Sequence, residues 1–80
     1  MDIEHLVKMA NQIEQFFRSE PDEQSAVAGI ESHLRRYWDP RMRSAIIEHC
    51  ARGGEGLGDL ARRAVIKLGP SPKSTSSTPS

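Results

Sequence analysis

Apolar residues recur at steps of three and four positions along most of this 80-residue chain, and that spacing constrains its fold most strongly. Such steps place side chains on one face of an α-helix, whereas a half-buried strand would alternate at every second residue. No segment alternates in that way, and no internal repeat is evident. The pattern therefore predicts an all-α protein, a small bundle of three to four helices.

Start and stop signals place the first two helices. The first is predicted over about residues 3–18, with Asp2 as its N-cap. The second follows the start signal SEPD, residues 19–22, in which Pro21 is expected in the first helical turn. Gly29 lies inside the second helix at a cost of about 1 kcal/mol relative to alanine, so we expect another helix to cross closely there.

The pair Asp39-Pro40 is predicted to be a structural turn between the second and third helices. The residue before a proline is driven out of the α region, so the second helix ends there. Asp39 can then cap the third helix, with Pro40 at its first position. Along this helix Glu48 and Arg52 are spaced as an ion pair, and the inward stripe consists of Met42, Ala45, Ile46, His49 and Cys50.

A glycine-rich connector, GGEGLGD, separates the third helix from a short fourth one. The fourth helix has an apolar stripe of Leu57, Leu60, Ala61, Ala64, Val65 and Leu68. Residues 1–68 are therefore predicted to form one helical domain. Residues 69–80 are rich in Ser, Thr and Pro and contain no hydrophobic residue, so they cannot offset their ordering entropy and are predicted to be a disordered tail.

Charge and hydropathy indicate the cellular location and the kind of partner to expect. The N-terminus carries Asp2 and Glu4, and no apolar run approaches the roughly 20 residues that span a bilayer, so we expect a cytoplasmic protein without a membrane partner. Residues 1–31 hold seven acidic and two basic residues, whereas residues 32–80 hold nine basic and four acidic ones. Either the halves neutralise each other on folding, or a basic face meets an acidic partner.

Motifs for catalysis, cofactors and metals are absent from the sequence. The glycines match neither GxGxxG nor GxxxxGK[ST], and the three histidines lack metal-ligand spacing. His49 and Cys50 are adjacent on a helix, so their side chains point about 100° apart, and Cys50 is expected to be a small buried residue. No catalytic, cofactor-binding or metal-binding residue is therefore predicted.

The segment HLRRYWDPRMR, residues 33–43, supplies most of the candidate binding residues. The expected docking surface is the Tyr37–Arg43 turn with the adjacent outer faces of the second and third helices. Its candidate partner-binding residues are Arg35, Arg36, Tyr37, Trp38, Arg41, Arg43 and Ile47.

Two features of this segment leave alternatives open. Arginines beside aromatic rings also suit phosphate contact and base stacking, so a small nucleic-acid-binding helical protein is the alternative function. Trp38, one turn after Leu34, continues the apolar stripe and is expected in the core or at its rim. Arg41 and Arg43 face the positive end of the third helix dipole, so we expect compensation by Asp39, by the acidic first two helices, or by carboxylates of a partner.

Two segments, MANQIEQFF (residues 9–17) and HLRRYWDPRMR, resemble the delta subunit of the soluble NAD-dependent formate dehydrogenases. The resemblance spans about residues 3–68, with Tyr37 where phenylalanine is expected. It implies a non-catalytic accessory subunit that supports assembly, cofactor insertion or stability of a molybdenum enzyme oxidising formate to carbon dioxide. It also implies that the molybdenum, iron–sulfur and flavin groups belong to larger subunits, and that the partner is the molybdenum-bearing alpha subunit.

Overall fold

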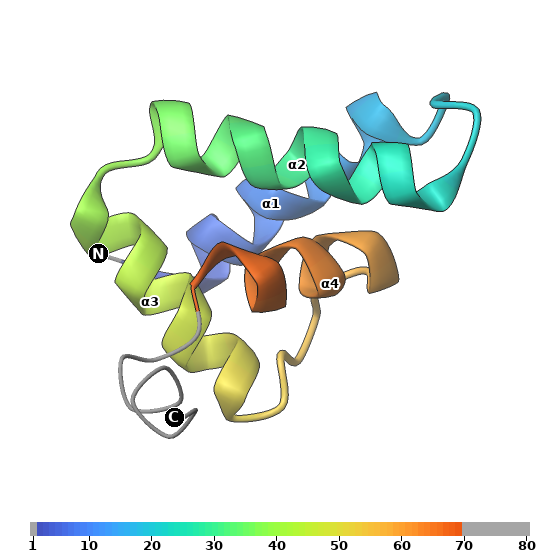
Figure 1. The fold of residues 1–80 in the computed structure, drawn as a ribbon. Coiled ribbons are helices and arrows are strands. Elements are labelled where there is room, and N and C mark those ends of the chain that lie inside the picture. Colours follow the sequence, from blue (N-terminus) through green and yellow to red (C-terminus); the bar gives the residue numbers. More distant parts are fainter. Residues whose placement is uncertain (1, 70–80) are drawn as a thin grey trace, which may run out of the picture.

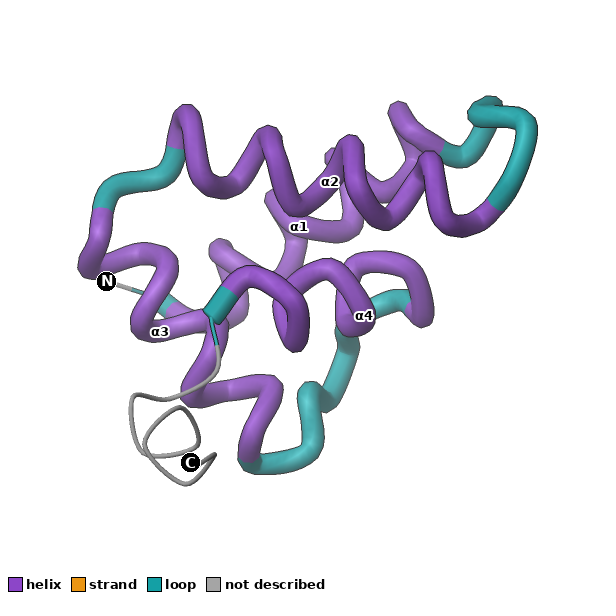
Figure 2. Tube along the Cα trace, viewed as in Figure 1, coloured by secondary structure: helices purple, strands orange, loops and turns teal. Residues whose placement is uncertain are grey.

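The computed structural model describes residues 2–69, which form an all-α fold, as predicted (Figures 1 and 2). Its four helices are α1 (Ile3–Phe17), α2 (Glu23–Tyr37), α3 (Pro40–Ala51) and α4 (Asp59–Leu68). Beyond Gly69, the predicted disordered tail lies outside the described residues. None of these four helices is long and apolar enough to cross a membrane.

Aspartates cap the first three helices through local hydrogen bonds. Carboxylate oxygens of Asp2, Asp22 and Asp39 accept from main-chain N–H groups two or three residues ahead, at 3.0, 2.7 and 2.9 Å. The turn at Asp39-Pro40 is confirmed, with Pro40 in the first turn of α3. The placement of Pro21 is wrong: because Asp22 is the N-cap of α2, Pro21 precedes the helix.

The core forms where α4 packs chiefly against α2, while α1 passes behind both helices in the view of Figure 1. Ala61 and Ala64 are fully buried, and their small side chains let the α4 backbone approach its neighbours closely. The buried cluster comprises Leu6, Ala10, Val27, Ile30, Leu34, Trp38, Ile46, Leu57, Ala61, Ala64, Val65 and Leu68. It draws on all four helices, so no helix pair holds the core alone.

Gly29 is a point of close approach, as expected. A Cβ atom built there would lie 2.5 Å from Cδ1 of Phe17, whose ring comes from the end of α1. Real Cβ contacts essentially never fall below 3.0 Å. A larger residue here must therefore displace the Phe17 ring, so packing favours glycine at this position in spite of its low helix propensity.

The ion pair and the end of the third helix are as predicted, whereas Cys50 is less buried than expected. Glu48 and Arg52 form the predicted ion pair at 3.0 Å, and α3 ends at Ala51, before two glycines with positive φ. Cys50 is only partly buried, because it lies near the exposed end of α3. In the described chain, an ion pair from Arg63 of α4 to Glu23 of α2, at 2.9 Å, joins the basic and acidic halves across the bundle, and this hydrogen bond raises the pKa of Arg63.

Candidate protein-docking site

Tyr37 and Trp38 are neighbours in sequence but face different environments. The Trp38 side chain is 4% exposed and belongs to the core, whereas Tyr37 is 69% exposed. The expectation that the indole lies at the core is confirmed. A buried indole is not available for stacking on a base, and truncating it would cost about 3–5 kcal/mol of folding stability. A substitution of Trp38 would therefore test the core and not docking.

Arg43 contacts main-chain oxygens at the C-terminus of α2. Its Nη1 donates to the carbonyl of Arg35 at 3.2 Å and to the carbonyl of Trp38. The end of a helix carries partial negative charge on its unpaired carbonyls, so the cation is stabilised there. The charge of Arg43 is therefore compensated by main-chain carbonyl groups, whereas the sequence predicted acidic side chains of this chain or of a partner. The folded turn brings the end of α2 to the start of α3 and so creates this contact.

Arg35 and Ile47 also have contacts within the chain. Arg35 donates through Nε and Nη2 to Glu31, at 3.1 and 2.9 Å. Ile47 is partly buried against the core, and a Cβ atom built on Gly69 would lie 2.8 Å from its Cδ1. Ile47 therefore packs against the end of α4, which limits its surface for a partner.

Three candidates have exposed side chains with no ion pair or hydrogen bond within residues 2–69: Arg36, Tyr37 and Arg41. They lie on both sides of the Asp39-Pro40 turn. This part of the predicted surface therefore presents two cations and one aromatic ring to solvent.

An open apolar groove lies beside Tyr37, between α1 and α2. It has a volume of about 500 Å³, and its lining includes Trp38 and two exposed aromatic rings. Its full lining is Met9, Gln12, Ile13, Phe16, Phe17, His33, Tyr37 and Trp38. The sequence did not predict this groove, because its two walls are 16 or more positions apart along the chain.

Phe16 is the most exposed aromatic residue lining the groove, at 74% exposure, and sequence reasoning missed it. Its ring meets that of Phe17 edge to face, with centroids 5.0 Å apart. On the opposite wall the His33 and Tyr37 rings lie 4.8 Å apart. Two sequence features could have indicated this surface: Phe16 lies outside the apolar stripe of the first helix, and His33 and Tyr37 are aromatic rings spaced by four residues. Exposed aromatic and methionine side chains are typical of protein interfaces.

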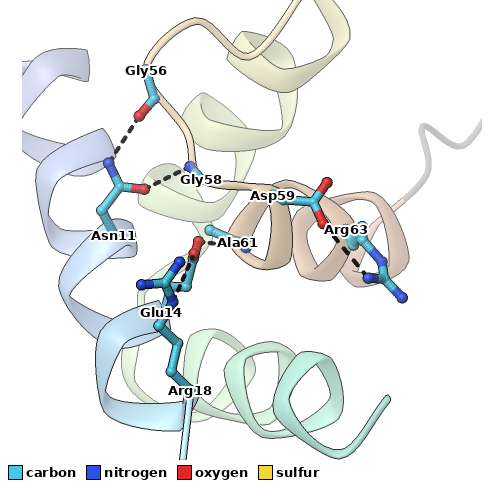
Figure 3. Close-up of polar contacts among 8 residues, drawn as sticks. All are labelled: Asn11, Glu14, Arg18, Gly56, Gly58, Asp59, Ala61 and Arg63. Carbon is cyan, nitrogen blue, oxygen red and sulfur yellow. Dashed lines mark hydrogen bonds and ion pairs between the residues drawn. The ribbon is translucent and has the colours of Figure 1, made fainter. Parts of the chain in front are cut away.

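Polar side chains on α1 hold the glycine connector and the start of α4 (Figure 3). Asn11 donates through Nδ2 to the carbonyl of Gly56 and accepts through Oδ1 from the N–H of Gly58, both at 2.9 Å. Glu14, only 5% exposed, accepts through Oε1 from the N–H of Ala61 at 3.0 Å. Gly58, the N-cap of α4, has no side chain to cap the helix, so a carboxylate from α1 supplies the cap.

Potential metal and nucleophile groups are dispersed over the described chain. Among residues 2–69, no three His, Cys, Asp or Glu side chains lie close enough together to hold a metal ion. Nε2 of His49 lies 2.8 Å from the carbonyl oxygen of Glu55, while the Cys50 thiol faces the carbonyl of Arg62 at 3.9 Å. The two neighbours thus have separate partners.

Comparison with known proteins identifies a family. A family model described as "NADH-dependant formate dehydrogenase delta subunit FdsD" matches residues 5–65. This stretch covers most of α1 and α4, all of α2 and α3, and every residue that lines the groove. Comparisons with curated proteins and with solved structures gave no match.

Proposed function

The chain belongs to the family of NADH-dependent formate dehydrogenase delta subunits, and from this premise we propose that it is a non-catalytic accessory subunit. It supports assembly, cofactor insertion or stability of the enzyme that oxidises formate to carbon dioxide. In this proposal its partner is the molybdenum-bearing alpha subunit, and the molybdenum, iron–sulfur and flavin groups belong to the larger subunits.

The observation that carries the proposal is the match of a subunit family over residues 5–65. Geometry adds two exposed rings, Phe16 and Tyr37, beside an open apolar groove. A chain of this size buries only about 60% of the surface that it exposes when unfolded, so stabilisation by a partner is a substantial gain. Both features are those of a small subunit that works through contact with larger ones.

The experiment is to produce the enzyme with and without this chain in a host whose own copy of the gene is deleted. We expect the tagged chain to co-purify with the alpha subunit in a fixed ratio. Without the chain, we expect lower formate-dependent NAD reduction and less molybdenum per alpha subunit. A fully loaded, fully active enzyme made without the chain would refute the accessory role.

Adding the purified chain later separates two ways of acting. If activity and molybdenum content recover only when the chain is present during synthesis, it acts in assembly or cofactor insertion. If it slows the thermal inactivation of enzyme that is already loaded, it stabilises the finished complex. An inactive-site variant of the alpha subunit is the control for background NAD reduction.

A further inference from the structure

The groove between α1 and α2 has helical walls with side chains in helical register. On α1 the wall residues Met9, Ile13 and Phe16 are spaced by four and three positions, and on α2 His33 and Tyr37 are one turn apart. Rows of this kind accept the ridges of another helix. A third helix laid into the groove is therefore the occupant that the geometry fits.

The exposed rings beside the groove are not explained by the fold itself. Phe16 and Tyr37 are 74% and 69% exposed, and neither belongs to the buried cluster. Rings of this kind remove on the order of 150–250 Å² from water when they are covered. A partner that covers both would gain apolar burial without disturbing the core.

Two cations close to Tyr37 in the sequence, unpaired within residues 2–69, indicate the chemistry of the partner. Arg36 adjoins Tyr37, and Arg41 follows the turn at the start of α3. Both are exposed, and neither has an ion pair or hydrogen bond within the described chain. Carboxylates are the natural partners of such guanidinium groups. The occupant should therefore combine an apolar face with acidic residues beside it.

Two other occupants fit less well. Residues 70–80 of the chain contain no hydrophobic residue, so they have nothing to place in an apolar groove. A second copy paired by twofold symmetry would bring the same patch of each copy into one interface, so Arg36 and Arg41 of both copies would lie in it together. Like charges meeting in this way oppose association.

We propose that the groove between α1 and α2, with Phe16 and Tyr37 at its sides, binds an amphipathic helix of a larger formate dehydrogenase subunit. The apolar face of that helix enters the groove, and its carboxylates meet Arg36 and Arg41. This inference rests on the proposed function, since it names the surface through which the subunit associates. It differs from the surface expected from the sequence by including α1.

The test uses formate dehydrogenase purified from a host that lacks this chain, immobilised as the probe, with the full-length chain as analyte. Phe16→Glu and Tyr37→Glu alter exposed side chains, and Ile66→Glu on α4, where Ile66 is 60% exposed, is the matched control. We expect the two groove variants to bind about tenfold or more weakly, as loss of an interface anchor does, and the control to bind as the wild type. Circular dichroism verifies that each variant is folded.

A separate experiment tests the contribution of the two arginines. We expect the double variant Arg36→Glu and Arg41→Glu to weaken binding at low salt and to lose most of the salt dependence that the wild type shows. A photo-crosslinking phenylalanine analogue at position 16 then identifies the contacted peptide. An amphipathic segment with acidic residues in a larger subunit supports the proposal.

The outcomes separate this inference from the proposed function. If the wild type binds and Phe16→Glu and Tyr37→Glu bind equally well, the groove assignment is overturned while the accessory role stands. If the wild type neither binds this enzyme nor crosslinks to any of its subunits when both are made in the same host, the proposed function fails and the inference fails with it. Crosslinks only to a second copy, with a dimer that Phe16→Glu dissociates, would assign the groove to self-association and overturn the proposal.

Discussion

The cap that Glu14 supplies to α4 makes a prediction whose sign can be tested. In Glu14→Ala, the N–H of Ala61, a residue with no exposed surface, loses its acceptor. An unsatisfied buried donor costs about 1–3 kcal/mol, and the lost charge–dipole interaction adds about 0.3–1 kcal/mol. Because the change also removes a buried carboxylate, which opposes this loss, we expect a net cost of about 1.5 kcal/mol.

The assay is urea and thermal unfolding of the isolated chain, followed by circular dichroism at 222 nm. For a domain of this size, about 1.5 kcal/mol lowers the melting temperature by roughly 6–12 °C. Glu14→Gln, which keeps an acceptor oxygen, should lose less than half of that free energy. Glu48→Ala is the matched control, since the Glu48 side chain is 65% exposed in its ion pair and its loss should cost under about 0.5 kcal/mol.

A substitution of Gly58, the N-cap of α4, tests the same contact between Glu14 and α4. A Cβ atom there would lie 2.7 Å from the carboxyl carbon of Glu14, so Gly58→Ser must displace the carboxylate from the Ala61 N–H. We expect it to destabilise the wild type by about 1 kcal/mol. In the Glu14→Ala background the space is free, and the serine hydroxyl should cap α4 and restore about 1 kcal/mol.

A double-mutant cycle over positions 14 and 58 tests whether Glu14 caps α4. A coupling free energy of about 2 kcal/mol between positions 14 and 58 would support the cap from α1. If Gly58→Ser has the same sign and size in both backgrounds, the reasoning about Glu14 is wrong. A Glu14→Ala variant as stable as the wild type would refute it as well.

Four further predictions concern single contacts. Gly29→Ala should lower the free energy of unfolding by about 1 kcal/mol, measured in urea, because its Cβ meets the Phe17 ring at the end of α1. Alanine favours helices, so a stabilised variant would show that this contact does not matter. Asp39→Ala should cost about 1 kcal/mol through lost capping of Met42, and Asp39→Asn only a few tenths, both measured by thermal unfolding. Arg43→Ala should cost about 1–2 kcal/mol by removing the cation from the end of α2, and unchanged stability would refute this. Phe16→Ser should leave stability within about 0.5 kcal/mol while weakening association with the enzyme, and a large loss of stability would place that ring in the core.

Local features of the sequence determined where three of the helices begin. Each of Asp2, Asp22 and Asp39 caps a helix by reaching an N–H group two or three residues ahead, so the signal and its partner lie in the same short segment. The apolar stripes likewise report on a single helix face. Trp38 was placed in the core for this reason, because it continues the stripe of Ile30 and Leu34.

Contacts between distant segments were decided only by the tertiary structure. Glu14 reads as one of several acidic residues on a helix, and its role depends on the N–H of Ala61, 47 positions away. The groove needs Phe16 and His33 from two helices, and Arg43 meets carbonyl groups that the turn brings to it. Periodicity determines which face of a helix is apolar, whereas the crossing of helices determines which side chains meet, and that follows from packing the whole core at once.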